Sequence, residues 1–156
     1  MIDIPIGKNN ITNVSILTMV IMFLITSYYI NHLPQEIPVH INSSGLPDKF
    51  GSKNGIWLIP MIAVGVFVLL TGLCFLCKML IQSSSANLQV RDVVELLLVL
   101  NLYFQLNFLF IVSCTIGIAL GKIQGLGTYY STMLISGLVL ISIYYLQKSV
   151  KYAMGH

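Results

Sequence analysis

The sequence predicts an all-α, polytopic membrane protein: a four-helix transmembrane bundle with a structured extracellular loop between helices 1 and 2. Its composition supplies the first two observations. Only 8% of the 156 residues are charged and 56% are hydrophobic, whereas about 25% of the residues in an ordinary soluble domain are charged. A soluble chain of this size would still expose about 30% of its unfolded-state surface to water. Composition therefore excludes a disordered chain, a disulfide-stapled secreted domain and, with a net charge of only +3, a typical nucleic-acid binder.

Four apolar runs are the third observation. They cover residues 14–30, 56–77, 93–120 and 129–146. Each is long enough to cross the hydrocarbon core as a helix, which takes about 17 to 25 mostly apolar residues. The runs are continuous rather than alternating, which favours helices over the strands of a barrel. We therefore expect a single membrane domain over residues 1–156, with a second helical pair at 92–147.

Each run has features that limit its helix. The first ends without a small-residue cleavage site, so we expect an uncleaved helix rather than a signal peptide. Pro60 lies in the first turns of the second helix, where its missing N–H costs little. The third run is longer than a span, so its polar first turn, with Asp92 and Glu95, is expected at the interface. Arg91 lies four residues before Glu95 and is its expected partner. The fourth begins at two tyrosines, which prefer interfacial depth.

Polar and glycine residues indicate how the later helices pack and connect. Asn101 and Gln105 share a face of the third helix, and we expect them to form hydrogen bonds with a neighbouring helix. A polar cavity or substrate path is the alternative for the same residues. Glycines in the connection 121–127 predict a flexible turn.

The distribution of Lys and Arg predicts the orientation. The side with the N-terminus, the loop around 78–91 and the C-terminus carries five of these residues, and the side with loops 31–55 and 121–127 carries three. We therefore expect a multi-pass plasma-membrane protein with both termini in the cytoplasm and the 31–55 loop facing outward.

The 31–55 loop is the most informative segment, because loops of this length without evident secondary structure are uncommon and often functional. Apolar and polar residues alternate after residue 36, which predicts an extended segment with Ile37, Val39 and Ile41 against the bundle or lipid. Pro38 would then point the other way, and it restricts the segment to an edge strand because it cannot donate a hydrogen bond. Residues 43–48 are rich in turn formers.

Acidic and histidine residues in this loop suggest three interpretations. His32, Glu36 and His40 are spaced four apart, but the intervening prolines exclude a continuous helix that would align them. Folding of the loop could instead gather Glu36, His40 and Asp48 as metal candidates. Alternatively, His40 and Asn42 bond to loop carbonyls and hold the loop's shape, or the loop recognises a ligand or partner.

A longer motif spans the loop. It reads Leu33-Pro34-x-x-Ile37-Pro38-x-His40-x-Asn42-x-x-Gly45-x-Pro47-Asp48-x-x-Gly51-Ser52-Lys53. Set between two apolar helices, this motif resembles domain-of-unknown-function family 1648, which opens the SdpI-type immunity membrane proteins of Gram-positive bacteria. The resemblance covers roughly residues 14–75. The family often has an aromatic residue where this chain has Ile41.

The resemblance implies a bacterial plasma-membrane protein of the immunity or envelope-defence type, protecting against a peptide toxin or envelope stress. We expect a non-enzymatic role without a cofactor. The expected partners are membrane lipids, a peptide toxin or membrane-protein partner, and a second copy in a homo-oligomer, but no nucleic acid. The ligand-binding candidates in the loop are Pro38, His40, Asn42, Gly45, Asp48 and Lys53.

The sequence is also consistent with two other classes of function. A small transporter, or an accessory subunit of a transport complex, would need an oligomer, because four helices barely enclose a path. An outer-leaflet membrane enzyme, metal-assisted through His40 with Glu36 and Asp48, is the second alternative.

Overall fold

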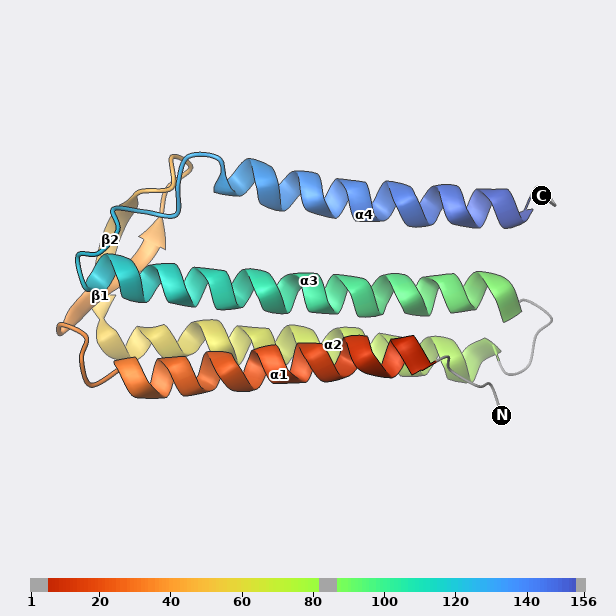
Figure 1. Ribbon diagram of the computed structural model, residues 1–156, viewed down its shortest axis with the longest axis horizontal. Helices are drawn as coiled ribbons and strands as arrows, with labels where there is room; N and C mark the ends of the chain where they lie inside the picture. The colour runs from red at the N-terminus through yellow and green to blue at the C-terminus, as the bar shows by residue number, and fades with distance from the viewer. Residues whose placement is uncertain (1–5, 82–86, 154–156) are drawn as a thin grey trace.

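The computed structural model describes residues 6–81 and 87–153. Its elements follow one another along the chain as α1 (Ile6–Tyr29), β1 (Glu36–Ile41), β2 (Pro47–Ser52), the 3₁₀ turn η1 (Lys53–Trp57), α2 (Leu58–Ile81), α3 (Asn87–Ala119) and α4 (Tyr130–Ala153). The four helices run side by side, with the β1–β2 hairpin at one end and the start of α1 and the end of α4 at the other (Figure 1). All four are long and apolar enough to cross a membrane. The predicted fold, a multi-pass helical bundle with a structured loop, is confirmed.

The helices extend beyond the apolar runs, chiefly at the end opposite the hairpin. α2 continues to Ile81, α3 already begins at Asn87, and α4 continues to Ala153. The apolar run marks the part of a helix that must sit in hydrocarbon, whereas the helix itself can continue into the polar interface. The connection 82–86, within the predicted loop around 78–91, lies outside the described residues.

Helix α3 is the centre of the bundle. It packs on α1, α2 and α4, whereas the contacts of α4 are mainly with α3. In the most apolar stretch of α4, 6% is buried inside the protein, whereas 22% of the corresponding stretch of α3 is buried. Most of the surface of α4 therefore faces lipid or another molecule.

Polar side chains join α3 to α2 at membrane depth. Asn101 Nδ2 donates to the Phe67 carbonyl oxygen at 3.5 Å and to Thr71 Oγ1 at 3.3 Å. Gln105 Nε2 donates to the Ala63 carbonyl oxygen at 3.0 Å. These bonds confirm the expectation that Asn101 and Gln105 bind a neighbouring helix.

A glycine ends α3 and turns the chain toward α4. Gly121 has a φ of 68°, and its N–H donates to the Ile118 carbonyl at 2.9 Å. The N–H of Lys122 donates to the Gly117 carbonyl at 2.8 Å. This pair of bonds is a Schellman motif, which satisfies the last carbonyls of the helix.

The β1–β2 hairpin corrects the predicted strand pattern. Ile37 is buried and His40 is exposed, as expected, but Pro38 is buried and Val39 is 53% exposed. The register shifts between Pro38 and His40, so Val39 is an extra residue in β1. A bulge of this kind breaks the two-residue alternation on which the prediction rested. Pro38 nonetheless lies in an edge strand, because the sheet has two strands only.

Candidate functional site: the hairpin and the groove between α3 and α4

The base of the hairpin is fixed to the bundle. Ile37 in β1 and Ile56 in η1 are each 1% exposed and belong to the core formed with α1, α2 and α3. The N–H of Lys53 donates to the Gln35 carbonyl at 2.9 Å, which closes the ends of the hairpin. Ser52 Oγ accepts the N–H of Asn54 and caps η1. The hairpin is thus held in one orientation above the membrane-spanning helices.

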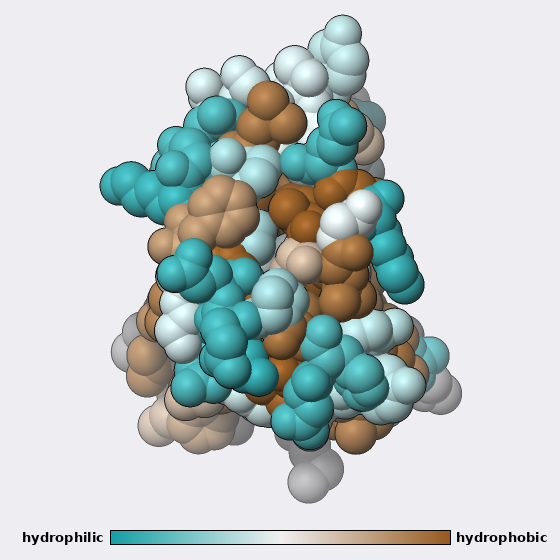
Figure 2. Space-filling view, turned by 90° about the vertical axis from the view of Figure 1, so that its left-hand side faces the viewer, coloured by the Kyte–Doolittle hydropathy of each residue, from teal (hydrophilic) through white to brown (hydrophobic). Residues whose placement is uncertain are grey.

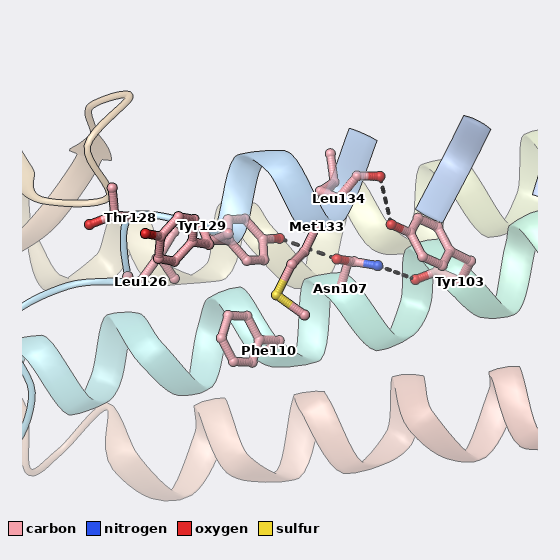
Figure 3. A pocket seen from close by; sticks show the side chains of 10 residues that line it. Tyr103, Asn107, Phe110, Leu126, Thr128, Tyr129, Met133 and Leu134 are labelled. Carbon is pink, nitrogen blue, oxygen red and sulfur yellow. Dashed lines mark hydrogen bonds between the residues drawn. The ribbon is translucent and has the colours of Figure 1, made fainter. Parts of the chain in front are cut away.

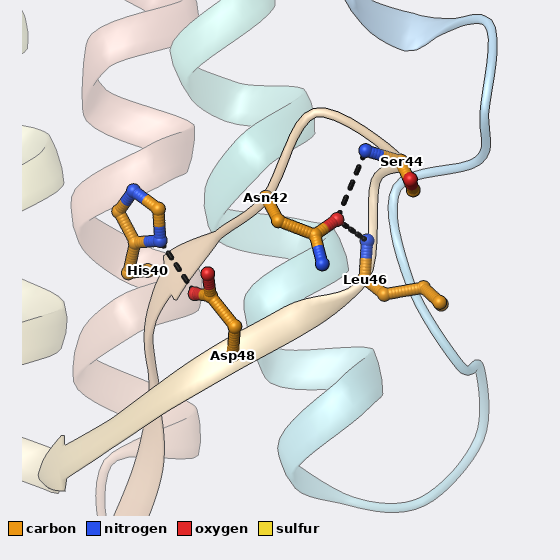
Figure 4. A network of polar contacts seen from close by, with 5 residues as sticks. All are labelled: His40, Asn42, Ser44, Leu46 and Asp48. Atoms are coloured by element: carbon orange, nitrogen blue, oxygen red, sulfur yellow. Dashed lines mark hydrogen bonds and ion pairs between the residues drawn. The ribbon is translucent and has the colours of Figure 1, made fainter.

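The turn of the hairpin is organised by Asn42. Its Oδ1 accepts the N–H groups of Ser44 at 2.9 Å and of Leu46 at 3.1 Å (Figure 4). Gly45 completes the turn with a φ of 77°, a conformation that favours glycine. Asn42 therefore holds the shape of the loop, which was one of the interpretations open from the sequence.

On the strands, His40 and Asp48 form a polar pair. His40 Nδ1 lies 2.5 Å from Asp48 Oδ1, and the two side chains remain 56% and 39% exposed (Figure 4). When Nδ1 donates to the carboxylate, the other ring nitrogen is left to accept a hydrogen bond from a ligand. His40 thus bonds to a carboxylate and not to the loop carbonyl that we considered.

The metal candidates are only partly brought together. Glu36 pairs with Ser52 at the base of the sheet, whereas His40 and Asp48 lie nearer the turn. Within residues 6–81 and 87–153, no group of three or more His, Cys, Asp or Glu side chains is placed to hold a metal ion. The hairpin therefore brings His40 and Asp48 together and leaves Glu36 apart from them.

The tip of the hairpin docks on the connection between α3 and α4. The Gly45 carbonyl accepts the N–H of Leu126 at 2.8 Å. A Cβ on Gly45 would lie 2.5 Å from the carbonyl oxygen of Gly127, and a Cβ on Gly125 would collide with the Gly45 carbonyl oxygen. The glycines of the connection, which predicted a turn there, also allow two backbones to approach closely.

Beside this contact, a groove of about 370 Å³ lies between α3 and α4. In Figure 3, Tyr103, Asn107 and Phe110 lie along α3, while Met133 and Leu134 belong to α4. The walls are mostly aromatic or aliphatic. The residues that line the groove are Tyr103, Asn107, Phe110, Leu126, Gly127, Thr128, Tyr129, Tyr130, Met133 and Leu134.

Hydrogen bonds and ring contacts fix the shape of the groove. Asn107 Nδ2 donates to the Tyr103 carbonyl at 2.8 Å, and Asn107 Oδ1 accepts from Tyr130 Oη at 3.4 Å. The ring of Tyr130 stacks on Phe110 with centroids 5.2 Å apart. Tyr103 Oη donates to the Leu134 carbonyl at 2.7 Å. An aromatic site preformed in this way loses little entropy when it binds an apolar group.

The hairpin and the groove meet at Leu126. Leu126 both bonds to Gly45 and lines the groove. The hairpin exposes further apolar side chains, with Val39 53%, Leu46 48% and Phe50 58% exposed. From the hairpin end, hydrophobic side chains are visible between hydrophilic ones (Figure 2). This end of the molecule can therefore offer both polar and apolar contacts to one ligand.

The six ligand-binding candidates occupy four places in this arrangement. His40 and Asp48 face outward as a pair, and Asn42 and Gly45 build the turn. Pro38 is buried and Lys53 is half-buried at the start of η1. Sequence reasoning missed the aromatic groove and its link to Gly45. The glycines in the two loops at the same end of the bundle were the available signal.

The comparisons with known proteins concern the N-terminal part of the chain. Residues 17–64 match the family model described as "Domain of unknown function (DUF1648)". The predicted resemblance is thereby confirmed for the second half of α1, the hairpin and the start of α2. The α3–α4 groove lies outside the matched segment. No curated protein and no solved structure matches the chain.

Proposed function

We propose that this chain is a non-enzymatic plasma-membrane protein of the immunity and envelope-defence type, which binds an amphipathic peptide toxin on its outward hairpin and α3–α4 groove. Both termini lie in the cytoplasm in this proposal. The observation that carries it is the hydrogen bond from Leu126 to Gly45, because it joins the polar hairpin to the aromatic groove.

Complementarity of the surface to an amphipathic ligand supports the proposal. Membrane-active peptides present a polar face and an apolar face at the bilayer surface. The His40–Asp48 pair offers acceptors to the polar face: the second ring nitrogen of His40 and the carboxylate of Asp48. Val39, Leu46 and Phe50, with the groove beyond them, offer apolar area to the other face. Capture of the peptide there would keep it from inserting into lipid.

Protection of a sensitive cell tests the proposal. The protein is expressed in a Gram-positive host, and the minimal inhibitory concentrations of a panel of amphipathic peptide toxins are measured with and without it. We expect it to raise the inhibitory concentration of at least one peptide. The variant Gly45→Ala, which undocks the hairpin, should abolish this effect.

Gly65→Ala is the matched control, because a Cβ at Gly65 in α2 has nothing within 4 Å. It should protect as well as the wild type when membrane levels are equal. Failure of the wild type to protect against any peptide of the panel, or full protection by a folded His40→Ala, Asp48→Ala double variant, contradicts the proposal.

A small transporter, or an accessory subunit of one, is the second candidate. Two observations favour it: most of α4 is left uncovered by its own chain, and Asp92 and Lys148 pair within the spanning segments of α3 and α4. Such a function needs more than one copy or a larger partner. A strictly monomeric protein in lipid nanodiscs, without a co-purifying subunit, counts against it.

A further inference from the structure

A buried carboxylate lies between α3 and α4 at the end of the bundle opposite the hairpin. Asp92 is 3% exposed, and its Oδ1 lies 3.0 Å from Lys148 Nζ. The same Nζ lies 3.1 Å from Glu95 Oε2. Two carboxylates of α3 therefore share one ammonium group of α4.

One oxygen of this carboxylate has no partner among the described residues. Asp92 Oδ2 is buried and receives no hydrogen bond from the residues that the structure describes. A buried charged oxygen without a donor is unfavourable, because it has lost its water and gained nothing in return. Its position therefore suits a ligand that brings a donor.

A cavity of about 380 Å³ adjoins Asp92. Val93 and Leu96 of α3 contribute apolar walls, and Ser142 and Ser149 of α4 contribute hydroxyl groups. A water molecule occupies only about 30 Å³ of liquid, so a bare metal cation or a single water would leave most of this space empty. The cavity suits a larger group that carries positive charge.

The cavity lies at the depth of lipid headgroups. Asp92 is the second residue of the spanning segment Arg91–Ala119, and Lys148 is near the end of the segment Tyr130–Lys151. The α3 segment has 29 residues and is about 43 Å long, which matches a bilayer with its headgroup regions rather than the hydrocarbon alone. Its terminal residues therefore meet the headgroups.

We propose that this cavity binds the headgroup of an aminophospholipid, with the primary ammonium group on Asp92 Oδ2 and the phosphate beside Lys148 Nζ. The lysine ammonium has three donors, of which two are directed at Asp92 and Glu95. The ring of Tyr145, which also lines the cavity, lies 5.4 Å from the nitrogen, and a phosphate oxygen would take the third donor in place of this ring contact. A choline headgroup has no N–H to donate and is excluded from the carboxylate by its methyl groups. A glycerol headgroup carries no cation.

Competition between two lipids tests this site. The purified protein is exchanged into bilayer nanodiscs that contain equal amounts of phosphatidylethanolamine and phosphatidylcholine with identical acyl chains, and the retained lipid is measured by native mass spectrometry. We expect the wild type to retain the ethanolamine lipid about tenfold more than the choline lipid, the effect of one charge-assisted hydrogen bond. Asp92→Asn should remove this preference.

Two further variants distinguish loss of this site from the loss of a carboxylate elsewhere and from failure to fold. Glu36→Gln makes the same chemical change at the hairpin end and should keep the preference. Ser149→Phe fills the cavity while both charged partners stay in place, so it should lose the preference even if Asp92→Asn does not fold.

The outcomes that overturn the site are distinct. Equal retention of both lipids by the wild type contradicts it, as does a preference that survives both Asp92→Asn and Ser149→Phe. Stabilisation by sodium ions over choline ions, without any lipid preference, would identify a small-cation site in its place.

Discussion

The carbonyl oxygen of Gly45, at the tip of the hairpin, accepts the backbone N–H of Leu126, in the connection between α3 and α4, at 2.8 Å. This bond joins the segment that matches a known family to the helical pair that does not. It also ties the hairpin that carries the His40–Asp48 pair to the connection whose Leu126 lines the aromatic groove. Substitutions around it test how the two halves depend on each other.

Gly45→Ala should destabilise the protein by about 2–4 kcal/mol, because alanine is strained at a φ of 77° and its Cβ would meet Gly127. Thermal unfolding in detergent measures this as a lower Tm. Gly65→Ala, in an open helical position, should leave the Tm unchanged or raise it slightly. Equal Tm values for the two variants would show that the docked tip contributes nothing.

Asn42→Ala should loosen the hairpin without unfolding the helices. The substitution removes the acceptor of two backbone N–H groups, those of Ser44 and Leu46, at a cost of about 1–2 kcal/mol. Limited proteolysis should therefore cut within the hairpin faster than in the wild type. Asn42→Asp keeps the acceptor oxygen and should be cut at the wild-type rate; similar cleavage of Asn42→Ala and wild type contradicts the role of this side chain.

His40→Ala and Asp48→Ala should each change stability by less than about 1 kcal/mol, because exposed ion pairs contribute little. Both should nevertheless reduce peptide protection, since the pair is proposed to contact the ligand. Chemical unfolding and inhibitory concentrations, measured on the same variants, separate the two effects. Loss of stability in proportion to loss of protection would assign the pair a structural role.

Gly137→Ala should displace α4 from α3. A Cβ there would lie 2.6 Å from Tyr103 Oη, whose hydroxyl is bonded to the Leu134 carbonyl. We expect a cost of about 1–3 kcal/mol from overpacking. In a Tyr103→Phe background the cost should be smaller, because the nearest atom is gone. A double-mutant cycle on unfolding free energies measures the coupling, and strictly additive effects would contradict it.

The sequence contained enough information for the helices but not for the contacts between them. A bilayer demands long apolar runs, so four spans could be predicted from the length and position of those runs. The extra turns of α2, α3 and α4 lie where polar residues are tolerated, so apolar runs do not mark them. Asn101 and Gln105 were predictable because a polar side chain at membrane depth needs a partner on another helix.

The alternation of apolar and polar residues predicted only part of the hairpin. The segment was recognisably extended, but the bulge at Val39 depends on the pairing of β1 with β2 and moved Pro38 to the buried side. The bond between Gly45 and Leu126 joins backbone atoms of residues far apart in the sequence, so only the glycines of the two loops point to it. The groove likewise arises only when Tyr130 stacks on Phe110.

The order of synthesis also determines when the hairpin can dock. Ribosomes release residues from the N-terminus onward, and the earlier parts of a chain generally fold first. The hairpin tip is complete well before Leu126 is synthesised, so it has no docking partner until the connection to α4 has emerged. Docking of the tip onto that connection is therefore a late assembly step. Little of α4 is buried by the rest of the chain, so few other contacts hold this helix in place before the tip docks.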